Sequence, residues 1–248
     1  MSGDRLRLDE ALVLRGLAPS RARARDMVKR GTVSVDGRPE AKPARMVEAN
    51  QAIAVSDPAQ YYVSRSALKL ITALDAFGFD PIGLVSLDLG ASTGGFTQVL
   101  LERGAAHVIA VDVGHDEMDS SLAADPRVTL IEGLNARDLQ RAHLGGREIH
   151  AVVVDLSFIS LKLALPPALG LAEPGAWGVF LVKPQFEVGR KALGKGGIVR
   201  DESIARQAAE DIAKWLESEQ VWRVVGPVPS PIAGGSGNRE FLLGAKNG

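Results

Sequence analysis

The chain has 248 residues, no cysteine and a formal net charge of −1. Without cysteine it can form no disulfide, use no thiol nucleophile and hold no cysteine-ligated zinc or iron–sulfur group. No run of about 18 apolar residues could span a membrane as a helix, and the first residues include acids where a signal peptide has its apolar core. We therefore expect a cytoplasmic protein with room for one medium domain and one small one.

The charge is unevenly distributed along the chain. Residues 1–60 hold 11 Lys and Arg against 8 Asp and Glu, whereas residues 61–248 hold 18 against 22. A net charge near zero argues against a nucleic-acid partner only if it is evenly spread. Six of the bases lie between Arg15 and Arg30, a density that occurs on solvated helix faces and on phosphate-binding surfaces alike.

The first 57 residues are predicted to form a small unit of two helices and a few short strands. Helical spacing of apolar residues, capping residues and turn dipeptides define the elements. They are a helix from Leu8 to a break at Gly16, a helix after Ser20 that runs to Lys29 and ends at Gly31, a strand at 32–35 before the Asp36–Gly37 turn, a further extended stretch after that turn, and a strand at 53–55.

The stretch Ser20–Gly37, SRARARDMVKRGTVSVDG, resembles the S4 RNA-binding domain, although another kind of helical hairpin would share the pattern. The resemblance implies that a basic second helix contacts RNA phosphates. We expect an S4-like domain over residues 1–57, a linker over 58–63 and a second domain over 64–248. The expected RNA-binding residues are Arg21, Arg23, Arg25, Lys29, Arg30 and Arg65.

The second domain alternates strands with helices, which predicts an α/β fold with a Rossmann-like parallel sheet covered on both faces. Ligands of such sheets bind where the strands end. Strands are expected at 84–90, 108–111, 128–131, 152–154, 179–182, 222–228 and 240–243, and helices at 64–77, 96–103, 116–124 and 201–218.

A glycine-rich turn, DLGASTGGFT, spans Asp88–Thr97 between a predicted strand and a helix. It lacks the lysine of a phosphate loop and the G-x-G-x-x-G order of a dinucleotide site. Gly90–Gly94 formally matches the G-x-S-x-G nucleophile elbow, but no histidine follows Asp155 as a serine hydrolase would require. An S-adenosylmethionine site fits better, with Gly90, Ala91, Ser92, Thr93, Gly94 and Gly95 as cofactor-binding residues.

The carboxylate of Asp112 supports this interpretation, because it ends the next strand in AVDVG, where a carboxylate can accept both ribose hydroxyls of the cofactor. Asp112 could instead cap the following helix. Asn135, after the third strand, is a candidate for adenine binding, although by itself it is also typical of a turn.

Four charged residues lie where a structural role alone explains them poorly. Asp155 and Lys183 each end a buried apolar strand, Glu240 opens the last strand, and Lys69 lies on the polar stripe of the first helix of the second domain. A buried lysine is costly unless it is paired, so Asp155 or Glu240 is expected to face Lys183. The alternative is a structural ion pair at the edge of the sheet.

Six segments in order resemble the TlyA family of ribosomal RNA 2′-O-methyltransferases, which join an S4 domain to an FtsJ-like methyltransferase domain. They are YVSRSALKL, DLGASTGGFT, AVDVG, DLSFISL, LVKPQFE and GNREF. The resemblance implies S-adenosylmethionine as cofactor, ribosomal RNA or a ribosomal subunit as partner, cytidine as the modified nucleoside, and no metal. It assigns the catalytic tetrad to Lys69, Asp155, Lys183 and Glu240, with Asp155 also near the cofactor.

Three functions remain open from the sequence. The first is methyl transfer to a ribose 2′-hydroxyl, with Lys183 as general base or electrostatic clamp, Asp155 orienting it, and Lys69 and Glu240 positioning the group. The second is a non-catalytic RNA-binding or ribosome-assembly factor. The third is a small-molecule methyltransferase, which would have no use for the basic first domain. A haemolysin-type virulence protein, after the old label of the family, is a further alternative, although the sequence shows no amphipathic or spanning membrane segment.

Overall fold

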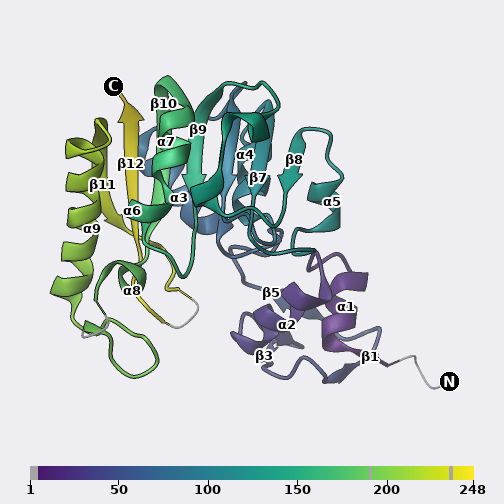
Figure 1. Ribbon diagram of the computed structural model, residues 1–248. Helices are drawn as coiled ribbons and strands as arrows, with labels where there is room; N and C mark the ends of the chain where they lie inside the picture. The colour runs from purple at the N-terminus through teal and green to yellow at the C-terminus, as the bar shows by residue number, and fades with distance from the viewer. Residues whose placement is uncertain (1–4, 190–191, 235–236) are drawn as a thin grey trace. The chain divides into compact units, whose positions relative to one another are not determined.

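The computed structural model describes residues 5–189, 192–234 and 237–248. Its contacts divide the chain into two units, Met1–Ala67 and Leu68–Gly248. The expected linker therefore belongs by its contacts to the first unit. Figure 1 shows the elements of each unit.

The first unit packs two helices against short strands. Its helices are α1 (Leu8–Leu14) and α2 (Arg21–Lys29), and its strands are β1 (Leu6–Arg7), β2 (Val33–Val35), β3 (Arg38–Pro39), β4 (Met46–Val47) and β5 (Ile53–Val55). Strands β3, β2 and β5 form one antiparallel sheet, and β1 pairs with β4. The apolar stripes of both helices and the inward residues of β2 bury a common core that includes Leu12, Met27 and Val35.

The predicted boundaries of α2 are confirmed. The Ser20 hydroxyl accepts a hydrogen bond from the Arg23 backbone N–H, as an N-cap does, and Gly31 after the helix has a φ of +75°. Asp36 and Gly37 both have positive φ values and turn the chain from β2 into β3. The two-residue strands β1 and β4 were not predicted, because so short a stretch carries no periodic signal, whereas β3 falls in the extended stretch expected after the Asp36–Gly37 turn.

The second unit contains a seven-stranded mixed sheet. In spatial order the strands are β11 (Trp222–Pro229), β12 (Phe241–Asn247), β10 (Ala172–Val182), β9 (Ile149–Val154), β6 (Val85–Leu89), β7 (His107–Val111) and β8 (Val128–Ile131). The five strands from β10 to β8 are parallel, whereas β12 is antiparallel to both of its neighbours. The expectation of a parallel sheet is therefore wrong at β12. The sequence did not indicate the direction of this strand, because buried parallel and antiparallel strands have similar apolar residues.

Helices cover both faces of this sheet (Figure 1). Side chains of α9 (Glu202–Ser218), α6 (Leu161–Ala164) and α7 (Pro166–Leu171) share one core with Leu87 and Leu243. The opposite face carries Asp88 and Gly244, which contact α4 (Gly95–Glu102) and α3 (Ala67–Phe77) respectively. The remaining helical segments are α5 (Ser120–Ala123), α8 (Pro184–Glu187) and the 3₁₀ turns η1 (Ala136–Asp138) and η2 (Arg141–Leu144).

Two predicted helices are shorter than expected. The helix predicted at 64–77 begins only at Ala67, and the helix predicted at 116–124 is reduced to α5, which is capped by the Asp119 carboxylate.

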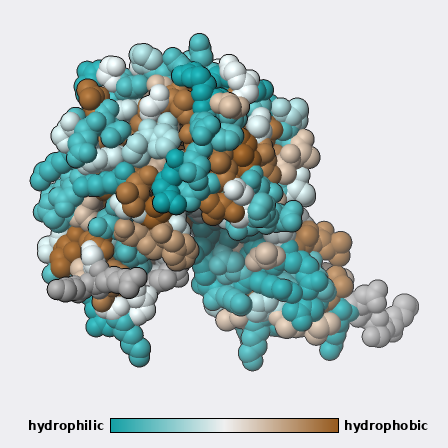
Figure 2. Space-filling model, viewed as in Figure 1, coloured by the Kyte–Doolittle hydropathy of each residue, from teal (hydrophilic) through white to brown (hydrophobic). Residues whose placement is uncertain are grey.

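The described part of the chain contains no helix long and apolar enough to cross a membrane. On the visible face in Figure 2, apolar side chains form small groups among hydrophilic ones.

Candidate active site

Strand register brings the predicted catalytic residues to one edge of the sheet. Val182 of β10 lies opposite Phe241 of β12, so Lys183, which follows β10, and Glu240, which precedes β12, reach the same edge. Strand β9 lies beside β10 on the other side and ends just before Asp155. Because β12 is antiparallel to its neighbours, the residue just before it can join side chains from the ends of the parallel strands.

The four side chains form a buried chain of ion pairs. Lys183 Nζ lies 2.6 Å from Asp155 Oδ1, and Lys69 Nζ lies 2.6 Å from Glu240 Oε2 and 3.8 Å from Asp155 Oδ2. Lys69, Lys183 and Glu240 are 7%, 8% and 4% exposed. Two cations and two carboxylates therefore offset one another in a site that excludes most water, which is what makes such burial tolerable.

Lys183 has a second partner that the sequence did not indicate. Its Nζ donates a hydrogen bond of 2.7 Å to Ser157 Oγ, in the turn that follows β9. The next residue, Phe158, has a φ of +65° and is 90% exposed, with its ring 5.2 Å from that of Phe186. The signal in the sequence that could have indicated this turn is the aromatic residue of DLSF, which follows the end of a predicted strand.

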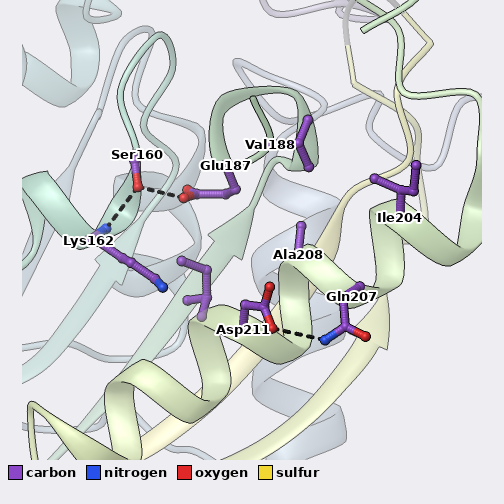
Figure 3. Close-up of a pocket in the computed structure, with 9 residues that line it drawn as sticks. Ser160, Lys162, Glu187, Val188, Ile204, Gln207, Ala208 and Asp211 are labelled. Atoms are coloured by element: carbon purple, nitrogen blue, oxygen red, sulfur yellow. Dashed lines mark hydrogen bonds between the residues drawn. The ribbon is translucent and has the colours of Figure 1, made fainter. Parts of the chain in front are cut away.

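The half-buried carboxylate of Glu187 links the two loops that carry Asp155 and Lys183. Glu187 of α8 accepts a hydrogen bond from Ser160 Oγ at 2.6 Å (Figure 3) and another from the Leu161 backbone N–H at 2.9 Å. Burial raises the pKa of Glu187, although these two hydrogen bonds act in the opposite direction. Ser160 and Glu187 also border a cavity of about 290 Å³ between α6, α8 and α9. Glu187 was not predicted as a site residue.

The glycine turn is in direct contact with the loop that carries Asp155. A Cβ atom on Gly90 would lie 2.7 Å from the backbone oxygen of Asp155, and Gly90 has a φ of +82°. Gly94, which precedes α4, has a φ of +95°, and a Cβ atom there would lie 2.5 Å from Leu122. Both positions therefore require glycine, and the turn leaves its backbone close to the catalytic edge.

Asp112 braces the same turn. Its Oδ2 accepts a hydrogen bond of 2.7 Å from the Ser92 backbone N–H, and its Oδ1 accepts one of 2.8 Å from that of Gly114. The helix-capping alternative does not apply, because Asp119 caps α5. Each carboxylate oxygen keeps a further lone pair, and Asp112 is only half buried, so its oxygens can still accept ligand hydroxyls.

Asp88 lies fully buried beneath the turn. Its Oδ2 accepts a hydrogen bond of 2.6 Å from Thr97 Oγ1, whereas within the described residues its buried Oδ1 has no hydrogen-bond partner. Burial raises the pKa of Asp88 to about 7, and the negative charge of Asp155 adds to the shift. An unpaired carboxyl oxygen, a glycine cradle and an accessible carboxylate on Asp112 suit a cofactor with an amino acid end and a ribose.

Asn135 occupies a cap position. Its Oδ1 accepts hydrogen bonds from the Arg137 backbone N–H at 3.1 Å and from Arg137 Nε at 3.3 Å. Its role in adenine binding stays a prediction, because the turn interpretation accounts for the same residue. Among the described residues, no group of three His, Asp or Glu side chains is placed to hold a metal ion.

The predicted RNA-binding residues of the first unit fall into two groups. Arg23 is buried, and its guanidinium donates to the Tyr62 and Ala59 carbonyls and to Asp57, while Arg30 also contacts Asp57. In this structure Arg23 thus fastens the linker instead of facing a phosphate. Arg65 lies 3.8 Å from Asp26.

The other group is exposed. Arg25 Nε lies 2.7 Å from the buried carboxylate of Asp9, and Arg21 also contacts Asp9. Burial alone would raise the pKa of Asp9, but hydrogen bonds from Arg7 and Arg25 outweigh it and hold this pKa well below its usual value. Lys29 is exposed and has no ion-pair partner within the described part of the chain. All three side chains are exposed, although Arg21 and Arg25 are already ion-paired, and Arg21 also contacts Glu10 at 3.0 Å.

The FtsJ-like methyltransferase model matches residues 62–247 and the S4 domain model matches residues 6–53. The chain is 48% identical over 240 residues to the 16S/23S rRNA (cytidine-2′-O)-methyltransferase TlyA of Mycobacterium tuberculosis, covering 96% of this chain and 89% of that protein. It is 36% identical to Hemolysin A of Brachyspira hyodysenteriae, covering 96% and 98% of the two chains.

A solved structure of a Streptococcus thermophilus protein labelled as a hemolysin matches with a TM-score of 0.78 and 36% identity, covering 98% of this chain and 88% of that one. These matches confirm the family resemblance, the fold class of a methyltransferase sheet with a small S4 domain, and the cofactor. The chain is therefore an S-adenosylmethionine-dependent methyltransferase of the TlyA family, in which an S4 domain is joined to an FtsJ-like methyltransferase domain.

Proposed function

We propose that this protein transfers a methyl group from S-adenosylmethionine to the ribose 2′-hydroxyl of a cytidine in ribosomal RNA. The observation that carries the proposal is the contact between the glycine turn and the catalytic loop: a Cβ on Gly90 would lie 2.7 Å from the Asp155 backbone oxygen. A cofactor held by Gly90–Gly95, Asp112 and Asn135 would lie next to the pair formed by Asp155 and Lys183. The name of the M. tuberculosis relative supports the nucleoside and the kind of RNA.

The bound cofactor supplies a methyl group that is already activated as a sulfonium. The residues of the chain must hold the 2′-oxygen in line with it, which replaces a bimolecular encounter and is the larger expected contribution to the rate. A bond forms between the 2′-oxygen and the methyl carbon, the bond from carbon to sulfur breaks, and its electron pair stays on sulfur. The hydroxyl proton goes to Lys183 Nζ when this amine is neutral and acts as the base, or directly to water when Lys183 is an ammonium clamp.

Lys183 is the central residue in this proposal. Asp155, 2.6 Å from its Nζ, orients it, while Lys69 and Glu240 hold Asp155 in place through their own ion pair. Because Lys183 is only 8% exposed, its electrostatic effect on a developing alkoxide is little screened by water. Both a general base and an electrostatic clamp use this same arrangement.

RNA binding is assigned to the exposed bases of α2, namely Arg21, Arg25 and Lys29, in a cytoplasmic protein that acts on ribosomal RNA or a ribosomal subunit. The 2′-hydroxyl must leave its helical surroundings to reach the cofactor, so a single-stranded or locally opened segment is the expected substrate. The exposed ring of Phe158 beside the tetrad offers a surface on which an unpaired base can stack.

The test is methyl transfer to defined RNA. The protein is incubated with methyl-labelled S-adenosylmethionine and, separately, with small subunits, large subunits and free ribosomal RNA, and any labelled nucleotide is mapped. We expect a 2′-O-methylcytidine that is lost in Lys183→Ala, while binding of the cofactor to this variant, measured by calorimetry, stays within about twofold. Absence of label from all RNA, or full activity of Lys183→Ala, would overturn the proposal.

A further inference from the structure

The Ser157 hydroxyl occupies an unusual position, because it is exposed and yet bonded to a buried lysine. Lys183 Nζ is 2.7 Å from Ser157 Oγ and 2.6 Å from Asp155 Oδ1, although Lys183 itself is only 8% exposed. Ser157 is therefore the contact through which the ammonium group of Lys183 meets the solvent-facing side of the site.

A hydrogen bond fixes the rotation of a lysine head group. A lysine ammonium has three N–H donors in tetrahedral positions. In the described residues, Nζ donates one hydrogen bond, to Ser157 Oγ, and forms an ion pair with Asp155 Oδ1, an atom that accepts no hydrogen bond. The hydrogen bond to Ser157 fixes one N–H direction and with it the other two positions on Nζ. One of these is left for the substrate, either as an N–H that donates to the 2′-oxygen or, in the neutral amine, as the lone pair that accepts its proton.

Without Ser157, Nζ would keep only its ion pair with Asp155, and the head group could turn about its Cε–Nζ bond. The position that faces the substrate would then lose its fixed direction. The turn that holds Ser157 is itself constrained, since Phe158 has a φ of +65°, a backbone conformation that a bulky residue adopts only when its surroundings impose it.

We propose that Ser157 is a positioning residue for methyl transfer: by accepting a hydrogen bond from Lys183, its Oγ directs a free Nζ position of that lysine toward the ribose 2′-hydroxyl. This inference rests on the proposed function, in which Lys183 acts on that hydroxyl. Ser157 acts through Lys183 and forms no bond with the transferred methyl group.

The test compares Ser157→Ala with Ser157→Thr in single-turnover and steady-state methylation of ribosomal RNA. Loss of one hydrogen bond to the ammonium predicts a kcat about tenfold lower in Ser157→Ala, with KM for RNA and for S-adenosylmethionine changed by less than about twofold. Threonine keeps the hydroxyl and should restore kcat to within about threefold of the parent. Ser218→Ala is the matched control. This exposed serine is the last residue of α9, and the next strand begins at Trp222. Trp222 pairs with Asn247, which lies at the end of β12 farthest from Glu240.

An unchanged kcat in Ser157→Ala, or a loss that threonine does not restore, overturns the inference. A loss seen only in KM or in RNA affinity also overturns it, because Ser157 would then contact RNA directly. Lys183→Ala is measured alongside: if it is fully active, the proposed function fails first. If Lys183→Ala is inactive and Ser157→Ala is normal, only the role of Ser157 is refuted.

Discussion

The ion pair between Lys69 and Glu240 gives the sharpest test of whether the tetrad is functional or structural. Its atoms lie 2.6 Å apart, and both side chains are at least nine-tenths buried. We consider three variants of the protein: Glu240→Leu, Lys69→Met, and the two changes together. The single changes leave one buried charge without its closest partner, whereas the double change replaces both charges by apolar groups of similar length.

The stability effects follow from burial. In Glu240→Leu the nearest remaining carboxylate to Lys69 Nζ is Asp155 Oδ2 at 3.8 Å, which already serves Lys183. Breaking a buried pair in this way costs about 3–5 kcal/mol. For a unit of this size that corresponds to a fall in Tm of roughly 6–20 °C. In the double variant we expect the free energy of unfolding to return to within about 1–2 kcal/mol of the parent, because no charge is left buried and unpaired.

Activity should not return with stability. Lys69 and Glu240 hold Asp155, and a displacement of about 1 Å at a catalytic group can cost a hundredfold in rate. The assays are thermal and urea unfolding, calorimetric binding of S-adenosylmethionine, and the rate of RNA methylation. The control is the exposed pair of Arg103 and Asp75, 44% and 58% exposed at 3.0 Å, where the same kind of double change should alter stability by at most about 1 kcal/mol and leave activity intact.

Two results would refute this reasoning. A double variant that is both stable and fully active would make this half of the tetrad a structural ion pair. Single variants that unfold like the parent would show that the charges are hydrated and that the burial argument fails.

Four further predictions use other parts of the structure. Gly90→Ala should abolish cofactor binding by calorimetry, because its Cβ would meet a backbone oxygen at 2.7 Å in a left-handed conformation. Asp88 is protonated in the folded state up to a pKa of about 7 against 3.8 in the unfolded chain. The protonated Asp88 side chain therefore stabilises the fold fully below about pH 4. This stabilisation, at most about 4 kcal/mol, is lost as the pH rises to about 7. Urea unfolding of Asp88→Asn should lack this part of the pH dependence. Lys29→Glu should weaken RNA binding and reduce its salt dependence without altering Tm, whereas Arg23→Ala should lower Tm. Phe158→Ala should lower kcat/KM for RNA by about 5- to 150-fold, the equivalent of one stacked base, and leave cofactor affinity unchanged.

Sequence patterns predicted the elements that have periodic apolar residues or residues suited to a special backbone geometry. The caps of α2 and the glycine turn were predictable because Ser20 and Gly90 occupy positions that few other residues can fill. The direction of β12 was not predictable, since antiparallel and parallel central strands bury the same apolar residues. The antiparallel direction of β12 nevertheless brings Glu240 to the tetrad. The residue type of Glu240 therefore indicated its place in the site better than the predicted topology did.

The same reasoning explains why basic residues of α2 were harder to assign than the tetrad. Arg23 and Lys29 have the same charge and lie on one helix, yet Arg23 is buried against linker carbonyls and Lys29 is exposed. Helical spacing alone does not separate them, because the linker that covers Arg23 folds back from 34 to 39 residues further along the chain. A lysine at the end of a buried strand has no such ambiguity: its burial is set by the strand, and it requires a partner. A charged residue can therefore be assigned to a function from the sequence when its own strand determines how deeply it is buried. Asp155 and Lys183 of the tetrad are residues of this kind.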